Sequence, residues 1–364
     1  MTIRELTNTL EQLAPPAFQE SYDNAGLIVG DANKEIDKAL VCFDVTEAVL
    51  KEAIETGAGL IISHHPIIFG GLKKLNGKNY VERIVMQAIK NDLALYAIHT
   101  NLDNVLLGTN SILAEKLGLK NIRALDPMPG RFRKLVTFVP KAQADKVRMA
   151  IFDAGAGHIG DYDQCSYNTE GQGSFRAGAN TNAFVGEKGQ LHFEEEVRIE
   201  TIFPDYLEGK ILRALLAAHP YEEVAYDIYK LENRSERLGA GIIGDLAEPA
   251  DEMDFLKNLK EITTAGCVRH TQLRNKAVKK VALCGGSGAF LINKAKAAGA
   301  DVYITGDVKY HEFFDADGQI LIADIGHYES EQFTKDLLVS YIKEKFPTFA
   351  VQKSACNTNP INYL

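Results

Sequence analysis

The run Leu60-Ile61-Ile62-Ser63-His64-His65-Pro66 passes from three large apolar residues to two adjacent histidines and a proline. The apolar part predicts a strand that is buried in the sheet of an α/β fold. Pro66 has no N–H group for a strand ladder and keeps His65 extended, so we expect the strand to end here. Ligands bind at the carboxyl edge of the strands in open α/β sheets, and the two histidines are predicted to lie at that edge.

The two histidines alone leave three interpretations open. Because neighbouring side chains of an extended chain point to opposite sides, His64 and His65 are not expected to chelate one small ion together. They can bind two different ions, or flank one site if the backbone is kinked. They can also be ordinary hydrogen-bonded histidines at the end of a strand. The choice depends on the metal-ligating residues elsewhere in the chain.

Strands and helices alternate around this run. Apolar strands are predicted at 39–44 and 93–98, and amphipathic helices at 46–57 and 80–90. Such alternation favours a mostly parallel sheet. The strand at 93–98 leads directly into His99-Thr100-Asn101-Leu102-Asp103. A second strand therefore ends in residues that can bind a metal ion.

The same pattern returns after residue 237. Strands are predicted at 278–283, 301–305 and 320–324, with a helix between the first two and another after the last. The last strand leads into Gly326-His327-Tyr328-Glu329-Ser330-Glu331. A third buried strand therefore ends in histidine and carboxylate residues.

The middle of the sequence repeats itself at an offset of 64 residues. Phe138-Val139-Pro140 matches Ile202-Phe203-Pro204, and Tyr162-Asp163 matches Tyr226-Asp227. Each copy predicts a strand, a proline, an amphipathic helix, a turn and a second strand, and two such units make a ferredoxin-like sandwich. The alternative is a chance similarity of two ordinary β-α-β units. The glycine-rich run at 168–178 between the copies predicts an exposed hairpin or loop.

Composition and charge limit the class of protein. A chain of 364 residues exceeds one average core, so two or three domains are expected. Its 46% hydrophobic and 24% charged residues are typical of a globular protein. A net charge of −9 argues against a nucleic-acid partner held through phosphate contacts.

The apolar runs, the first residues and the cysteines of the sequence predict the cellular compartment. No apolar run approaches the roughly 20 residues that span a membrane. The first residues predict an amphipathic helix capped by Thr2, without the pattern of a signal peptide. The five cysteines are far apart and form no C-x-x-C pair, which is typical of a reduced compartment. We expect a cytoplasmic protein with no membrane partner.

Two pairs of residues have the spacing of metal ligands. His99 and Asp103 are four residues apart, as are His327 and Glu331. If each pair begins a helix, its two side chains share a face and can converge on one ion. Imidazole nitrogen combined with carboxylate oxygen suits zinc, manganese or iron better than calcium. Together with the two adjacent histidines, these ligands exceed the needs of one ion, and two ions about 3.5–4 Å apart would use them all.

Two weaker candidates lie in the C-terminal third. Gly285-Gly286-Ser287-Gly288 follows a predicted strand, where it can cradle a phosphate through backbone N–H groups or form a tight turn. Asp307, Lys309 and His311 lie near the same edge of the sheet and are candidates for substrate contact. For Lys309 and His311 we favour an ordinary helix start.

Three motifs together resemble the NIF-three-like family, whose bacterial members are often labelled GTP cyclohydrolase I type 2-like. The motifs are Ser63-His64-His65-Pro66, His99-Thr100-Asn101-Leu102-Asp103 and Gly326-His327-Tyr328-Glu329-Ser330-Glu331. Asp23-Asn24-Ala25-Gly26-Leu27 and Thr305-Gly306-Asp307 also fit. The resemblance implies a dinuclear metal site whose ligands are His64, His65, Asp103, His327 and Glu331. His99 would line this site as a further ligand or as the partner of one.

The same resemblance implies an architecture. A discontinuous, two-lobed α/β metal-binding domain would be formed by residues 1–129 and 236–364. Residues 130–235 would be an inserted ferredoxin-like α+β domain, similar to the trimeric signalling proteins of the PII and CutA type. The family typically forms a toroidal homohexamer whose metal sites face the central cavity.

The function predicted from these observations is a dinuclear metal-dependent hydrolase that acts on a nucleotide or a related phosphorylated heterocycle. His99 is the candidate catalytic residue, because an imidazole can move a proton near neutral pH. In the labelled activity, water would attack the imidazole C8 of GTP, the ring would open and formate would leave. The alternatives are a metal-binding regulator or metal-handling protein without turnover, and a phosphoesterase.

Overall fold

The computed structural model describes residues 1–364, and the chain divides into two compact units. One unit is formed by Met1–Pro127 together with Ser235–Leu364, and the other by Met128–Arg234. The first unit contains two sheets and the second contains one. None of the helices combines the length and the apolar character needed to cross a membrane.

The first sheet carries the histidine run and is almost entirely parallel, as the sequence predicts. Its strand order is β1-β4-β3-β2-β15, and only the β1–β4 pair is antiparallel. The strands are β1 (Gly26–Val29), β2 (Lys38–Cys42), β3 (Leu60–Ser63), β4 (Ala94–Ala97) and β15 (Ala350–Lys353). Every residue of β3 and β4 is buried, which explains their continuous apolar sequence.

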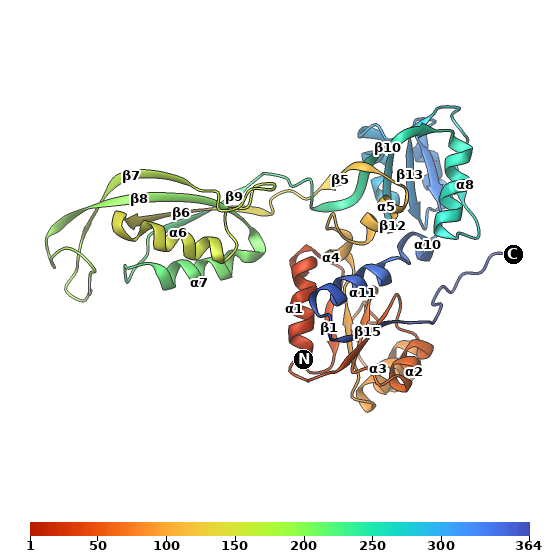
Figure 1. Cartoon of the computed structure of the whole chain (residues 1–364), viewed down its shortest axis with the longest axis horizontal. Coiled ribbons are helices and arrows are strands. Elements are labelled where there is room, and N and C mark those ends of the chain that lie inside the picture. Colours follow the sequence, from red (N-terminus) through yellow and green to blue (C-terminus); the bar gives the residue numbers. More distant parts are fainter. The chain divides into compact units, whose positions relative to one another are not determined.

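Helices cover both faces of this sheet. The helices are α1 (Ile3–Leu13), α2 (Glu47–Glu55), α3 (Tyr80–Lys90) and α11 (Thr334–Lys345). The start of α1 is fixed by a capping box in which Thr2 and Glu5 bond to each other's backbone N–H groups. Helix α11 packs beside α1 although the two are more than 300 residues apart, and Tyr341 donates to the carbonyl of Thr9 (Figure 1). Helices α2 and α3 pack on the opposite face.

The second sheet is mixed, in contrast to the mostly parallel sheet that the sequence predicts. Its order is β11-β14-β13-β12-β10-β5, and only the β12–β13 and β13–β14 pairs are parallel. The strands are β5 (Lys120–Pro127), β10 (Gly239–Ala250), β11 (Arg269–His270), β12 (Val278–Ser287), β13 (Val302–Gly306) and β14 (Leu321–Asp324). The chain passes from β5 into the second unit and returns from it into β10. The second unit is therefore inserted at the β5 edge of this sheet.

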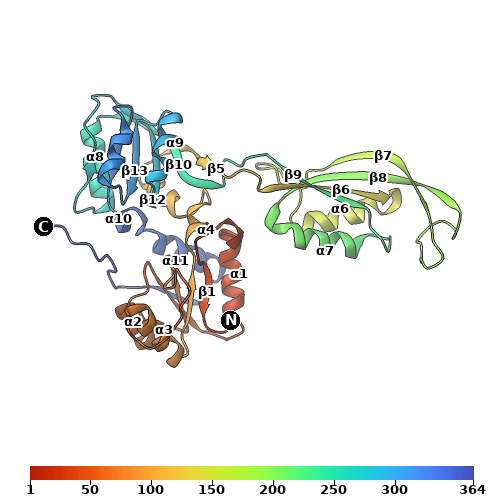
Figure 2. The same cartoon turned by 180° about the vertical axis from the view of Figure 1, so that it is seen from behind.

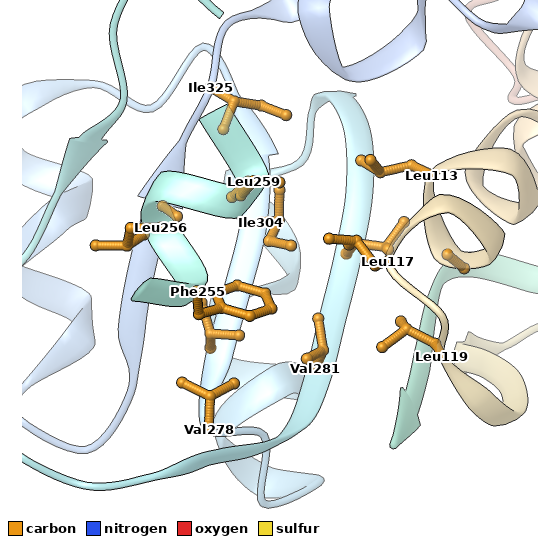
Figure 3. Packing of buried hydrophobic residues seen from close by; sticks show 14 of the residues in the cluster. Leu113, Leu117, Leu119, Phe255, Leu256, Leu259, Val278, Val281, Ile304 and Ile325 are labelled. Carbon is orange, nitrogen blue, oxygen red and sulfur yellow. The ribbon is translucent and has the colours of Figure 1, made fainter. Parts of the chain in front are cut away.

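The core of this sheet lies between β12–β13 and two helices. In Figure 3, Phe255 and Leu259 of α8 (Glu252–Thr263) face Ile304 of β13. Leu113 and Leu117, from α5 (Thr109–Lys116) and the residue after it, pack against the same face. The opposite face is covered by α9 (Ile292–Ala297), which lies on the other side of the sheet from α8 (Figure 2). Both faces of the sheet are therefore covered next to the edge where β13 and β14 end.

The second unit is a four-stranded antiparallel sheet with two helices on one face (Figure 1). In chain order it contains β6 (Phe132–Pro140), α6 (Ala144–Asp153), β7 (Tyr167–Arg176), β8 (Leu191–Pro204), α7 (Glu208–Ala218) and β9 (Tyr226–Leu231). The strand order is β7-β8-β6-β9. Each half begins with a strand that ends in a proline and is followed by a helix, which is the order the sequence repeat predicts.

One detail of the repeat is wrong, whereas the run between the two copies is an exposed arm of a hairpin, as predicted. The glycine-rich run at 168–178 belongs mainly to strand β7, which pairs with β8 from Tyr167↔Glu200 to Arg176↔Leu191. This strand is exposed along most of its length, so glycine and polar residues are tolerated and no apolar alternation marks it. Tyr162 does not begin a strand but lies in a tight turn, bonded through its backbone to Ile159.

Candidate metal centre

Three strand ends of the first unit bring the six predicted residues together. His64 and His65 directly follow β3, while His99 and Asp103 bracket the short helix α4 (Thr100–Asp103) after β4. His327 and Glu331 are the ends of α10 (His327–Glu331), which follows β14. Their ligand atoms form three groups that could each hold an ion, with all atoms of a group within 4.8 Å of one another. The groups are His64–His65–His99, His65–His327–Glu331 and His64–Asp103–Glu331.

Glu331 is the centre of this cluster. Its Oε2 lies 3.2 Å from Nε2 of His327, 3.5 Å from Nε2 of His65 and 3.8 Å from Nε2 of His64. On the far side, Nε2 of His64 lies 3.6 Å from Oδ1 of Asp103. Glu331 thus belongs to two of the three groups, one with His65 and one with His64, while the third group contains both histidines. Two separate ions and one site flanked by both histidines are each compatible with this arrangement.

All four histidines present Nε2 to the cluster because Nδ1 of each already has an acceptor. Three of the acceptors are carboxylates and one is a main-chain carbonyl. The pairs are His64 with the carbonyl of Ile98 at 2.9 Å, His65 with Asp44 at 2.8 Å, His99 with Asp23 at 2.7 Å and His327 with Asp307 at 2.7 Å. An Nδ1–H that donates to a carboxylate or carbonyl fixes the tautomer and leaves the Nε2 lone pair free for a metal ion.

The cluster contains buried acceptors that no protein group satisfies. Nε2 of His64, Oδ1 of Asp103 and Oε2 of Glu331 are buried and accept no hydrogen bond. A buried polar atom without a partner costs about 1–3 kcal/mol, and more when it is charged. Three such atoms directed at one small volume fit a cation, and nitrogen with carboxylate oxygen suits a transition metal. The residues therefore fit a metal site.

The electrostatics of the imidazoles agree with this assignment. Burial lowers the pKa of His65, but the hydrogen bond with Asp44 and the nearby carboxylate of Glu331 outweigh it and raise the pKa to about 10. Burial likewise lowers the pKa of His327, and the carboxylates of Glu331 and Asp307 raise it to about 9. The cluster therefore attracts positive charge strongly, whether the charge is a proton or a metal ion.

The two carboxylates of the cluster respond in opposite directions. Burial raises the pKa of Glu331, but the imidazoles of His327, His64 and His65, whose Nε2 atoms face its Oε2, hold it well below its usual range. Burial raises the pKa of Asp103, and the negative charge of Glu331 raises it further, although His64 opposes the shift. Glu331 is therefore the firmly ionised carboxylate of the pair.

Two glycines at the end of β12 make room for Glu331. A Cβ atom on Gly285 would lie 2.6 Å from Cγ of Glu331, and one on Gly286 would lie 2.6 Å from its Oε1. Gly286 also has a φ of +64°, which favours glycine.

The same stretch does not form a phosphate cradle. The N–H groups of Gly285, Gly286 and Gly288 already donate to the side chains of Asn110, Ser330 and Thr305. A phosphate needs N–H groups that are free to point at it. The other interpretation, a close-packed turn at the strand end, is the one the structure supports.

Some sequence predictions about individual residues need correction. His327 and Glu331 share a helix face as predicted, but His99 lies outside α4 with a φ of −121° and a ψ of −112°, and its ring turns to Asp23. Among the weaker candidates, the backbone N–H of Lys309 donates to Glu312 at the start of a 3-10 helix. His311 contacts the rings of Tyr310 and Phe314. Neither lines the cavity described next.

Three carboxylates that hold the histidine rings, Asp23, Asp44 and Asp307, are not among the metal-site residues that the sequence predicts. Asp44 lies just after β2 and Asp307 directly after β13, so both end predicted strands beside a histidine-bearing strand. Their position at the end of a predicted strand is the feature of the sequence that could have identified them. Asp23 lies in the turn before β1 and carries no such signal of its own.

A cavity of about 660 Å3 opens beside the cluster. His65, His99, Asp103, His327 and Glu331 all contribute to its wall. The candidate ligands are therefore accessible to a small molecule, although His64 itself is completely buried.

Comparison with known proteins places the chain in one family. The model of the DUF34/NIF3 (NGG1p interacting factor 3) family matches residues 1–360. A Halalkalibacterium halodurans protein named GTP cyclohydrolase 1 type 2 homolog is 41% identical over 360 residues, covering 97% of this chain and 96% of that protein. A Bacillus subtilis protein of the same name is 39% identical over 367 residues, covering 99% and 98%.

Solved structures agree along the whole chain. The crystal structure of a Bacillus cereus protein related to NIF3 is 40% identical, with a TM-score of 0.89, and covers 100% of this chain and 99% of its own. A Staphylococcus aureus protein structure, 30% identical, has a TM-score of 0.79 with the same coverage. The family match and these identities over nearly full length leave one conclusion: the chain belongs to the DUF34/NIF3 family.

Proposed function

We propose that the chain is a metal-dependent hydrolase whose substrate is a nucleotide or a related phosphorylated heterocycle. The observation that carries the proposal is the set of buried acceptor atoms without a donor on His64, Asp103 and Glu331. These atoms lie beside a cavity large enough for a small molecule. The name GTP cyclohydrolase 1 type 2 homolog, carried by the relatives, supports a heterocyclic substrate.

The proposed cofactor is a pair of divalent ions, zinc, iron or manganese, in each chain. Their proposed ligands are His64, His65, Asp103, His327 and Glu331. The support for two ions is that Oε2 of Glu331 takes part in two groups, one with each of the adjacent histidines. Glu331 would therefore be the residue placed to hold both ions.

His99 is the proposed catalytic residue. Divalent ions at this position would supply Lewis acidity and make water a nucleophile at neutral pH. Nδ1 of His99 donates to Asp23, which leaves Nε2 free to accept a proton and to pass it to a leaving group. Burial raises the pKa of Asp23, but hydrogen bonds from His99 and Thr100 lower it to about 2. Asp23 therefore stays ionised and stabilises the protonated imidazole.

The test is product analysis with GTP. Metal-loaded protein should release formate from GTP, and the reaction should stop when the metal is removed. His99→Gln should slow turnover by about 100-fold while changing metal content little, because general acid–base catalysis contributes about 10²–10⁴-fold. Asp103→Ala serves as the control that loses metal and activity together.

The assay also separates the alternatives. Phosphate without formate would assign a phosphoesterase. Neither product, with each of the three metals, would favour a regulatory or metal-handling protein. One observation favours a regulatory role: the second unit has its own cavity of about 590 Å3, whose wall includes the rings of Phe138, Phe175, Phe184 and Tyr221.

The organisation of the chain is part of the proposal. We propose that residues 130–235 are an inserted ferredoxin-like domain, similar to PII and CutA proteins, within a metal-binding domain formed by residues 1–129 and 236–364. The chain order β6-α6-β7-β8-α7-β9 and the sheet order β7-β8-β6-β9 support it.

We also propose a toroidal homohexamer in the cytoplasm. The support for a reducing compartment is that all five cysteines are unpaired. Light scattering of the purified protein should give a mass near six times the 40.1 kDa of the chain. A monomeric or dimeric mass would contradict the ring.

A further inference from the structure

Three exposed aromatic rings line the cavity beside the metal cluster. The exposed fractions are 69% for Tyr22, 56% for Phe69 and 68% for Phe290, and all three belong to the wall of the same cavity. A single exposed ring is ordinary on a protein surface, but rings gathered around one cavity mark a ligand site. The Phe69 ring lies 5.8 Å from the His99 ring, centroid to centroid. The aromatic wall therefore reaches the metal cluster.

Positive charge in this cavity is confined to the metal cluster, where His65, His327 and the proposed ions lie. None of the residues in its wall is a lysine or an arginine, whereas Glu20, Asp103 and Glu331 are acidic. Proteins bind phosphates through Arg, Lys or free backbone N–H groups. Among the glycines of the wall, Gly285 and Gly286 already donate their N–H groups to side chains. The side chains of this cavity are therefore built to recognise the ring of a substrate, not its phosphates.

Glu20 is anchored in the wall with one oxygen free. Its backbone N–H donates to Oγ1 of Thr100 at 2.9 Å, and its Oε1 accepts from Nδ2 of Asn104 at 3.1 Å. Asn104 is fixed in turn, because the same Nδ2 donates to the carbonyl of Phe18 at 2.9 Å. Oε2 of Glu20 accepts no hydrogen bond from the protein. A carboxylate held by one oxygen presents the other to a ligand that can donate.

Tyr22 lies in the field of the same carboxylate. Burial raises the pKa of its hydroxyl, and the negative charges of Glu20, Asp23 and Asp103 raise it further. The hydroxyl therefore remains a neutral donor, and Tyr22 belongs to the same wall as Glu20. An aromatic face and an acceptor thus occur on one wall that carries no lysine or arginine.

We propose that this cavity binds a planar heterocycle with two neighbouring N–H donors, such as the N1–H and 2-amino edge of a guanine, through Glu20 and the exposed rings. The inference rests on the proposed function, because it names the part of the substrate that the same site recognises. A carboxylate accepts well from two adjacent N–H groups. In guanine the imidazole ring lies opposite that edge, so a donor edge at Glu20 leaves C8 free to face the metal cluster.

The test is equilibrium binding of guanosine, inosine and GTP to the full-length, metal-loaded protein. Inosine differs from guanosine only by the missing 2-amino group, so guanosine should bind about tenfold more tightly. Glu20→Gln should remove that difference. Phe290→Leu should weaken guanosine about fivefold or more, because stacking on an aromatic ring is lost. Phe314→Leu is the matched control, since Phe314 is 66% exposed but lies outside the cavity wall.

Several results would overturn the inference. They are equal binding of guanosine and inosine, no binding of either nucleoside, an equal effect of Phe290→Leu and Phe314→Leu, and GTP binding more than about 30-fold tighter than guanosine. The last result would mean that the phosphates carry recognition, a difference of about 2 kcal/mol.

Binding and turnover can fail separately. Guanosine binding that depends on Glu20, without formate or phosphate from GTP, would contradict the proposed hydrolase and leave this inference standing. Formate release from GTP with an unchanged KM in Glu20→Gln would contradict this inference and leave the hydrolase standing.

Discussion

The orientation of each histidine in the cluster is fixed by its Nδ1 atom, which faces away from the cluster. Each Nδ1 is committed to a carboxylate or a carbonyl, so each Nε2 is aimed before any ion arrives. Preorganisation of this kind costs stability in the free protein, because Nε2 of His64 and Oε2 of Glu331 remain buried without a partner. We therefore expect that small changes around Glu331 alter metal affinity more than they alter the stability of the fold.

Gly286→Ala tests this expectation against a matched control. The added Cβ would lie 2.6 Å from Oε1 of Glu331, whereas Gly299 has a similar φ, +75° against +64°, and nothing within 4 Å. Both alanine variants should lose about 1–2 kcal/mol of unfolding free energy through the left-handed backbone. Only Gly286→Ala should also lose metal affinity, by about tenfold or more. Elemental analysis and thermal unfolding measure both quantities, and equal metal content in the two variants would contradict the space-filling argument.

Metal binding should release protons at neutral pH. His65 and His327 have pKa values of about 10 and about 9 without metal, so both carry a proton at pH 7. An imidazole must lose it to ligate through Nε2, so apparent affinity should rise as the pH rises toward 9. Calorimetric titration in two buffers with different ionisation enthalpies measures the number released. A heat that does not depend on the buffer would contradict the prediction.

The stability of the metal-free fold should change with pH in the opposite direction to the metal affinity. A histidine pKa that is raised in the folded state stabilises the fold below the unfolded value of about 6.5. For His65 this contribution is lost as the pH rises through about 10. Metal-free protein should therefore become easier to unfold by denaturant as the pH rises, while metal-loaded protein should show the opposite trend between pH 6 and 9.

At the scale of elements, strands with a continuous apolar sequence could be predicted and the others could not. β3 and β4 are short, fully buried and followed by histidines, so local sequence identifies them. β10 contains three glycines and a proline, and its strand character comes from pairing with β5 and β12 on either side. β15 has four residues, and its only neighbour, β2, lies about 310 residues earlier. Long-range pairing decides such strands, and sequence periodicity does not record it.

The residues of the candidate site also divide into those that the local sequence predicts and those that it does not. The six residues that the sequence predicts all directly follow apolar strands or lie in the short helices after them, a position that the local sequence pattern reveals. Asp23, Tyr22 and Phe69 lie in turns and loops, and Phe290 lies in the short 3-10 helix η4 (Ala289–Leu291). Their roles depend on which loops meet across the two lobes of the first unit, and no periodicity marks that.

The C-terminal segment is an element whose role extends to the site. After β15, Oγ1 of Thr358 donates to Oδ2 of Asp44 at 2.8 Å, and Asp44 holds the ring of His65 through its other oxygen. Thr358→Val should therefore weaken metal binding about tenfold without a large change in stability. Asn359→Ala is the control, because Asn359 lies on the same segment but donates to Glu329. Similar losses in both variants would mean that the segment acts as a whole and not through Asp44.

At the scale of the whole molecule, the two units differ in how much they depend on each other. The first unit is formed by two chain segments, and all six candidate ligands lie within it. The second unit has its own core, which includes Leu135, Val147, Ile199 and Leu215. A unit with a separate core can in principle fold alone, and its removal should leave the other unit intact if the chain can be rejoined.

Strand pairing indicates that the chain can be rejoined. Pro127 of β5 pairs with Gly239 of β10, so the two ends of the first unit at the insertion are neighbours in one sheet. Replacing residues 130–233 with a short Gly/Ser linker should give a folded protein that binds metal as the full chain does. Circular dichroism, thermal unfolding and metal analysis of the shortened chain are the measurements. The linker itself should impose no strain, because it joins strands that already lie side by side. Aggregation or loss of metal would therefore show that residues 130–233 are needed for the metal-binding unit to fold.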